Sequence, residues 1–161
     1  MELRLGSSEN DVLVAQNNLA LTYAKLGRRE AAMRLRRDVY SGRSRLDGEE
    51  HEDTLLAANN YSASLCELQR FEEARMLLRR TVPAIRRVLG EGHRLTLKTR
   101  WLYAQSLHDD PSAKLDDVRE AVKILEDTAR TARRVLGGAH PLTQGIERGL
   151  QKARATLAED G

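Results

Sequence analysis

The sequence has little of what strands and disulfides require. Aromatic residues make up 4% of the 161 residues, and proline occurs only 3 times. Helices tolerate such a composition better than sheets, because strands prefer β-branched and aromatic side chains. The one cysteine, Cys66, has no partner for an intramolecular disulfide, which fits a reducing compartment. We therefore expect an all-α protein built as a single domain over residues 1–161.

Long apolar runs and an excess of one charge are also missing. No stretch approaches the roughly 20 consecutive apolar residues of a membrane span, and the first residues lack the apolar centre of a secretion signal. The 27 Lys and Arg nearly balance the 24 Asp and Glu, for a net charge of +3, so a large positive field is not expected. We expect a cytoplasmic protein that does not associate with membranes.

Motifs of catalysis and metal binding are absent from the sequence. It has no glycine-rich phosphate loop, no GxSxG, no HExxH and no paired-cysteine site. His51, His93 and His140 recur at equivalent positions. Packed helices, however, lie about 8–10 Å apart, whereas zinc ligands lie about 2.0–2.1 Å from the ion. We expect these histidines to cap helices or to lie in turns. We expect the protein not to be an enzyme and to have no cofactor and no metal site.

What the sequence does contain is a repeat. Asn18-Leu19-Ala20 recurs as Asn60-Tyr61-Ser62 and as Leu102-Tyr103-Ala104, in steps of 42 residues. The third copy has five extra residues near 109–113, and a fourth copy stops after one helix. The predicted divisions are repeat 1 at 5–46, repeat 2 at 47–89, repeat 3 at 90–136, and a terminal capping helix and tail at 137–161.

Each copy predicts two amphipathic helices. In the first helix, apolar residues such as Leu19, Ala20 and Tyr23 lie on one face at 3.6 residues per turn. In the second, the spacing i, i+3, i+4, i+7 begins at Ala32, Ala74 and Ala121. Because one hairpin cannot bury both faces, successive hairpins are expected to stack. We predict a right-handed α-solenoid of about seven helices.

The repeat resembles that of a known family. The pattern Leu-Gly-x-x-His-x-x-Thr-Leu runs from Leu89 to Leu97, Asn-Leu-Ala begins at Asn18, and Gly-Arg-x-x-Ala-Ala begins at Gly27. Together they resemble the 42-residue tetratricopeptide repeats of kinesin light chains. The resemblance covers residues 5 to about 157 and implies tetratricopeptide-type helical hairpins. The long heptad segment that joins kinesin light chains to the heavy chain is not seen, so a motor subunit is not expected.

The resemblance implies a binding face. In the family, the first helices line a concave groove that holds an extended peptide. The corresponding residues here are Asn17, Asn18, Leu21, Lys25, Asn59, Asn60, Ala63, Glu67, Lys98, Trp101 and Gln105, flanked by Val14, Leu56, Leu102 and Asp109. The resemblance predicts a non-enzymatic scaffold that binds a peptide or protein segment. The alternative is a structural spacer or an oligomerisation segment of a larger repeat protein.

The most notable groove residues have two interpretations each. Asparagine offers donors and an acceptor that suit a peptide backbone, but Asn18 and Asn60 would serve equally well to bond neighbouring helices. Trp101 suits an aromatic anchor for a partner, although packing against the following hairpin is slightly favoured. Cys66 is expected to be a small filler and not a reactive thiol.

Arginines crowd the predicted second helices, at Arg34, Arg36, Arg37, Arg79, Arg80, Arg86 and Arg87. Such a pattern also occurs in nucleic-acid binders. Acidic residues are interleaved, however, and stacking aromatics do not accompany the arginines, so a solvated outer face is favoured. We expect a protein or peptide partner, with self-association compatible with this, and we do not expect nucleic acid.

Overall fold

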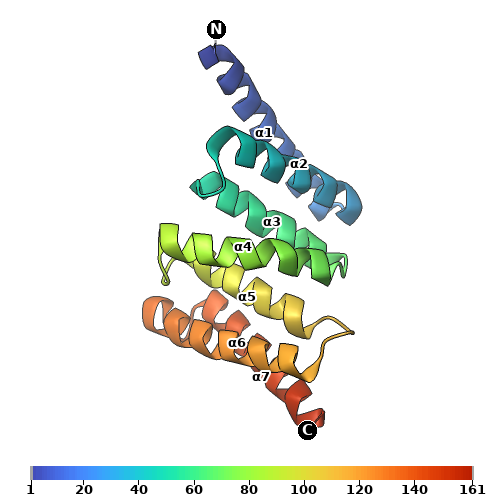
Figure 1. The fold of residues 1–161 in the computed structure, drawn as a ribbon, viewed down its shortest axis with the longest axis vertical. Coiled ribbons are helices and arrows are strands. Elements are labelled where there is room, and N and C mark those ends of the chain that lie inside the picture. The colour runs from blue at the N-terminus through green and yellow to red at the C-terminus, as the bar shows by residue number, and fades with distance from the viewer. Residues whose placement is uncertain (1, 161) are drawn as a thin grey trace.

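The computed structural model describes residues 2–160, with side chains described from residue 8 onward. Helices and short turns account for this part of the chain, and no strand occurs in it. Figure 1 shows the helices stacked in chain order. The predicted right-handed α-solenoid of seven helices is confirmed. The helices are α1 (Glu2–Lys25), α2 (Arg29–Asp47), α3 (Glu52–Glu67), α4 (Phe71–Leu89), α5 (Arg94–His108), α6 (Leu115–Leu136) and α7 (Pro141–Glu159).

A histidine starts the first helix of each later copy. His51, His93 and His140 have extended backbones, and each Nδ1 accepts a hydrogen bond from the backbone N–H two residues further on. The distances are 3.1, 3.1 and 3.0 Å. Each bond satisfies one of the amide groups that a first helical turn leaves without a partner. The expectation that these histidines cap the helices is confirmed.

Residues with positive φ follow the ends of α1, α2, α3, α4 and α6. The C-cap glycines of α2, α4 and α6 have φ of +90°, +88° and +86°, a region that glycine occupies at little cost. The turn between α1 and α2 uses Gly27, with φ of +76°, whereas the equivalent turn between α3 and α4 uses Gln69, with φ of +59°. Gln69 is the one residue other than glycine with a positive φ in the described part of the chain.

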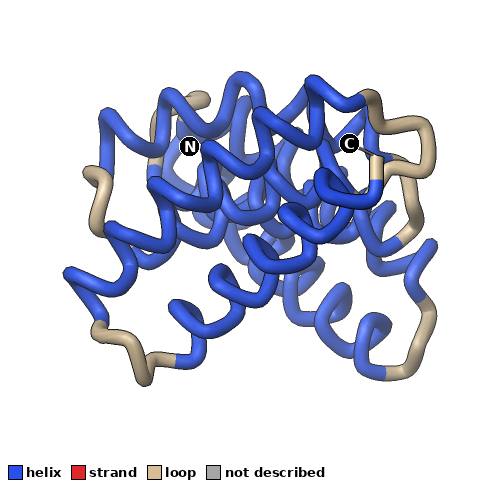
Figure 2. The backbone as a smooth tube through the Cα atoms, turned by 90° about the horizontal axis from the view of Figure 1, so that it is seen from below, coloured by secondary structure: helices blue, strands red, loops and turns tan. Residues whose placement is uncertain are grey.

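The stack has an inner and an outer layer. Each helix packs on its neighbours in the chain; α3 also packs on α5, and α5 on α7, whereas α2, α4 and α6 do not contact one another. Helices on the inside of a curved stack lie closer together, so the odd-numbered helices form the concave side. Seen along the stack in Figure 2, the turns lie at the two sides and the helices run between them.

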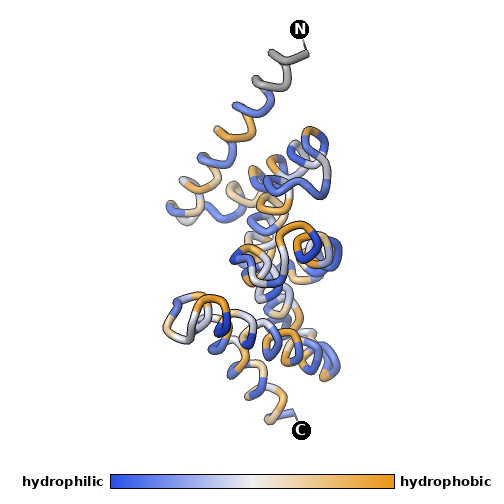
Figure 3. The backbone as a smooth tube through the Cα atoms, turned by 90° about the vertical axis from the view of Figure 1, so that its left-hand side faces the viewer, coloured by the Kyte–Doolittle hydropathy of each residue, from blue (hydrophilic) through white to orange (hydrophobic). Residues whose placement is uncertain are grey.

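The apolar core is thickest towards the C-terminus. A continuous cluster joins α5, α6 and α7 and includes the fully buried Leu107, Leu125 and Ile146. From residue 8 onward, α1 buries only Leu13 and Ala20, and it packs on α2 alone. In Figure 3 the first coloured turns of α1 stand clear of the other helices, and apolar and polar stretches alternate along them.

The extra residues predicted near 109–113 lie in the connection between α5 and α6. Arg75 of α4 fixes this connection, because its guanidinium donates to Asp110 at 2.9 Å and to the carbonyl of Ser106 at 2.6 Å. The proposed repeat divisions, after residues 46, 89 and 136, fall at or beside the last residues of α2, α4 and α6. None of the helices described here combines the length and apolar character that crossing a membrane requires.

Candidate functional site

Three hollows follow one another along the concave side. The first, of about 160 Å³, lies between α1 and α3 and is lined by Val14, Asn17, Leu56 and Asn60. The second, of about 240 Å³, lies between the starts of α3 and α5 and includes Leu56 and Lys98. The third, of about 590 Å³, lies between the ends of α3 and α5 and extends to α7, with linings that include Ala63, Glu67, Leu102, Gln105 and Asp109.

The predicted groove residues fall into two groups. Those that line the hollows are Asn17, Asn60, Ala63, Glu67, Lys98 and Gln105. Asn18, Leu21 and Lys25 are exposed on α1 outside the hollows, whereas Asn59 and Trp101 are half-buried. The structure therefore brings the first group together along one face and directs part of the second group into helix packing.

The asparagines differ in what they contact. The side-chain oxygen of Asn59 accepts a hydrogen bond from the hydroxyl of Thr99 at 3.0 Å, which ties α3 to α5. The side chains of Asn18 and Asn60 make no hydrogen bond within the described residues. Asn59 thus holds the stack, while Asn60 leaves its amide facing the first hollow, where an amide group offers both donors and an acceptor.

Trp101 packs against the helix that follows α6. Its ring lies so close to Gly145 and Gly149 of α7 that a Cβ added at Gly145 would lie 2.7 Å from the ring atom Cη2. The indole Nε1 is buried and has no hydrogen-bond partner among the described residues. Two glycines on one face of α7 therefore create the space that this large ring needs, and the arrangement is that of a packing residue.

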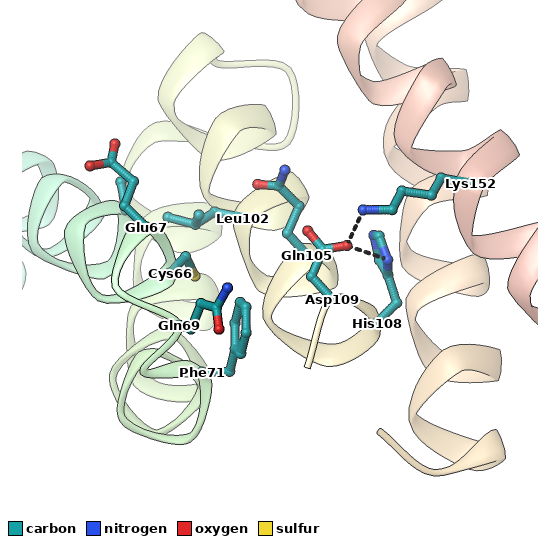
Figure 4. Close-up of a pocket in the computed structure, with 10 residues that line it drawn as sticks. Cys66, Glu67, Gln69, Phe71, Leu102, Gln105, His108, Asp109 and Lys152 are labelled. Carbon is teal, nitrogen blue, oxygen red and sulfur yellow. Dashed lines mark hydrogen bonds and ion pairs between the residues drawn. The ribbon is translucent and has the colours of Figure 1, made fainter. Parts of the chain in front are cut away.

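The third hollow contains a charged cluster, drawn in Figure 4. The Nδ1 of the buried His108 lies 3.0 Å from Oδ1 of Asp109, and the ammonium of Lys152 donates to the same oxygen at 2.7 Å. Burial by itself would raise the pKa of Asp109, but the contacts with His108 and Lys152 outweigh it and lower the pKa to about 2. The carboxylate is therefore ionised at neutral pH and joins the end of α5 to α7.

Cys66 lines the same hollow. Burial raises the pKa of its thiol to about 12, and the negative charges of Asp109 and Glu67 add to the effect, against a smaller opposing effect of Arg75. Only the thiolate is strongly nucleophilic, so this cysteine is unreactive at neutral pH. The structure supports the filler interpretation.

One group of potential metal ligands occurs in the described residues. Oxygen and nitrogen atoms of Asp47, His51 and Asp53 lie within 4.8 Å of one another. The Nδ1 of His51 is already used as a helix cap, and Asp47 lies 3.3 Å from the guanidinium of Arg43. These contacts account for the cluster as the end of α2 meeting the start of α3.

Several arginines of the outer layer are paired. Arg86 contacts Glu91 at 2.5 Å, Arg87 pairs with Glu50, and Arg36 donates to the hydroxyl of Ser64 at 2.6 Å. These contacts use the guanidinium donors within the protein.

The contributions of His108 and Lys152 to the site are not evident in the sequence. The sequence predicts α7 only as a terminal capping helix, whereas in the structure its Lys152 reaches Asp109 across 43 residues of chain. Asp109 itself is expected beside the groove. A periodic apolar pattern shows which face of α7 is buried, but it does not show which charged residue at the edge of that face meets a partner on α5.

Comparison with known proteins identifies the repeat. The sequence pattern of the tetratricopeptide repeat matches residues 11–84 and 53–110, and a second pattern of the same repeat matches residues 113–142. The chain belongs to the tetratricopeptide repeat family. The expected resemblance to repeats of the kinesin-light-chain type is confirmed. A search of the curated proteins found no match.

Solved structures of similar fold have low sequence identity. Nearly identical TPR-like repeats from Podosopora anserina, assigned to a kinesin light chain, are 21% identical, with a TM-score of 0.78 over 92% of this chain and 69% of that one. BtubC (BKLC) from P. vanneervenii is 17% identical, with a TM-score of 0.61 over 94% of this chain and 62% of that one. At these identities the likeness shows the tetratricopeptide fold.

Proposed function

We propose that this tetratricopeptide repeat protein is a non-enzymatic scaffold that holds an extended peptide or protein segment along its concave side. Tetratricopeptide repeats generally mediate protein interactions. The observation that carries the proposal is the succession of three hollows along α1, α3 and α5, lined by six of the predicted groove residues. The first and second hollows share Asp53 and Leu56, so an extended segment can pass from one into the other.

All three hollows combine apolar surface with charged residues of both signs. Val14 and Leu56 offer apolar surface in the first hollow, beside the amides of Asn17 and Asn60. The second hollow carries Lys98 and Arg94 beside Glu52 and Asp53, and the third carries Glu67 and Asp109 beside Lys152. An apolar side chain would lie against Leu56 while the amides bond the peptide backbone, and charged side chains on either side would select the register.

Peptide selection from a random display library tests the proposal. We expect the selection to enrich peptides that share a sequence motif. Binding of a selected peptide is then measured by fluorescence anisotropy. Replacing Asn17, Asn60 and Gln105 together with alanine should weaken binding at least about tenfold, because the peptide loses several hydrogen bonds worth about 0.5–1.5 kcal/mol each.

The matched control replaces three exposed residues of the outer layer, Arg34, Glu72 and Lys123, with alanine. This variant should bind the selected peptide as the unaltered chain does, and circular dichroism should show equal helicity for both variants. If the outer-layer variant loses binding and the concave-side variant retains it, the peptide binds elsewhere. Enrichment of no peptide at all would also contradict the proposal.

A further inference from the structure

An exposed stripe runs along one side of α1 and continues to the residue after it. It consists of Val12, Ala15, Leu19, Thr22 and Leu26, which recur at intervals of three and four residues and so lie on one face. All five are exposed, and the three largest, Val12, Leu19 and Leu26, keep 53%, 42% and 66% of their surface accessible. We refer to these five residues as the α1 stripe. It is distinct from the α1 residues at the first hollow, Val14 and Asn17.

The corresponding face is covered in the next two copies. At 42 residues further on, Thr54, Ala57 and Ser64 are buried, and Tyr61 and Leu68 are half-buried. The covering helix is α2: its Arg36 donates to the hydroxyl of Ser64 at 2.6 Å, and the ring of its Tyr40 lies 6.1 Å from that of Tyr61.

The same relation holds between α4 and α5. Thr96, Thr99 and Ser106, which occupy the stripe positions of α5, have no exposed surface, and Arg75 of α4 donates to the carbonyl of Ser106 at 2.6 Å. The stripe positions are therefore the surface on which each first helix receives the preceding helix of the stack. On α1 no helix of the described chain covers this surface: α1 packs on α2 alone, Leu13 and Ala20 are its buried residues, and Val12 only borders a hollow shared with α2.

Charged residues beside the stripe are complementary in an antiparallel pair. Asp11 and Lys25 lie on the same edge of the stripe near its opposite ends, and neither has an ion-pair partner within the described residues. If a second α1 runs antiparallel with Leu19 facing Leu19, Val12 meets Leu26 and Asp11 meets Lys25 on both sides of the two-fold axis. The helices that cover α3 and α5 in the stack also run antiparallel to them.

We propose that the α1 stripe is a self-association surface, on which α1 of a second copy of this chain docks antiparallel about a two-fold axis through Leu19. A two-fold interface needs one self-complementary patch, which the stripe and its two flanking charges provide. A single helix pair buries less surface than the roughly 1,200–2,000 Å² of most stable complexes, so the dimer is weak and depends on concentration. The concave sides of both copies stay accessible.

Sedimentation equilibrium of the full 161-residue chain over a concentration series tests the proposal. We expect a monomer–dimer equilibrium. Leu19→Glu should weaken the dimer by about a hundredfold or more, because two buried leucines are lost and two like charges face each other on the axis. Leu21→Glu is the matched control: Leu21 is 46% exposed but lies on another face of α1, so this variant should dimerise as the unaltered chain does.

Charge reversal tests the antiparallel alignment. Asp11→Lys and Lys25→Asp should each weaken the dimer, and the double variant should restore it, with the effects diminishing at high salt. Circular dichroism should show that the variants keep their helicity. The proposal is overturned by a chain that stays monomeric at every concentration, by higher oligomers, by a dimer that survives Leu19→Glu, or by equal effects of Leu19→Glu and Leu21→Glu. If each single charge reversal weakens the dimer but the double variant does not restore it, the antiparallel arrangement is overturned.

Discussion

Single residues at turns decide how each helix begins and ends. The histidine caps are local, since each side chain bonds an amide two residues away, and this is why their role can be predicted from their recurrence. The turns after α1 and α3 share one backbone conformation but use different residues, Gly27 and Gln69. A side chain in the left-handed region costs roughly 1–2 kcal/mol because Cβ approaches the following carbonyl oxygen.

Gln69→Gly should therefore stabilise the protein by about 1 kcal/mol, reduced from the full strain by the extra entropy of glycine in the unfolded chain. Urea denaturation followed by circular dichroism measures the change. The reciprocal variant is Gly27→Gln, at the equivalent turn, where an added Cβ meets nothing within 4 Å but φ is +76°. Gly27→Gln should destabilise the protein by a similar amount. If Gln69→Gly instead destabilises the protein, the glutamine side chain contributes more stability than its strained backbone costs.

Two side-chain contacts join α5, or the residue that follows it, directly to α7. One such contact is the carboxylate of Asp109, which has its pKa lowered to about 2 by His108 and Lys152 in spite of burial. The other is the ring of Trp101 against the two glycines of α7. Both connect residues more than 40 positions apart and neither follows from the repeat, because Asp109 and Trp101 have no equivalents of the same type in the other copies.

The Asp109 contact predicts a pH dependence of stability. Because the folded pKa lies below the ordinary value of 3.8, the folded state favours the ionised form. The stabilisation, on the order of 2 kcal/mol, is complete above about pH 5 and is lost as the pH falls through 4 towards 2. Lys152→Met should raise the pKa of Asp109, lower the free energy of unfolding at pH 7, and flatten the acid dependence.

Urea denaturation at a series of pH values measures the acid dependence, and carboxyl titration by NMR measures the pKa itself. Lys123→Met is the control, since this exposed lysine of α6 makes no ion pair within the described chain. It should leave the acid dependence unchanged. An Asp109 carboxyl that titrates near pH 4 in the unaltered protein would contradict the contact.

The packing of Trp101 makes Gly145 sensitive to substitution. Alanine normally favours a helix interior over glycine by about 1 kcal/mol. Here the added methyl group would meet the ring at 2.7 Å, so Gly145→Ala should destabilise the protein by about 1–3 kcal/mol. Thermal unfolding and tryptophan fluorescence measure the effect. Adding Trp101→Leu should recover much of the loss, and a neutral Gly145→Ala would show that the ring moves aside without cost.

At the scale of the whole described stack, the first and last helices differ in how much of their apolar surface is covered. The last helix of the stack, α7, buries Leu142, Ile146 and Leu150 against the core. The first helix, α1, keeps its stripe exposed within the described chain, whereas the equivalent residues of later copies are covered. In a solenoid each repeat is stabilised mainly by its neighbours, so the proposed dimer would supply to α1 the second neighbour that the other first helices have, and would place two concave sides in one assembly.

The sequence by itself determined the helices, their order, their caps and the family, because these depend on patterns that recur within one or two turns of helix and at a spacing of 42 residues. Only the tertiary structure decided that Asn59 bonds Thr99 and that Trp101 packs on α7. It also decided that Lys152 reaches Asp109. The physical reason is distance along the chain: periodicity shows which face of a helix is apolar, whereas the partner of each side chain depends on the curvature that brings α3, α5 and α7 together.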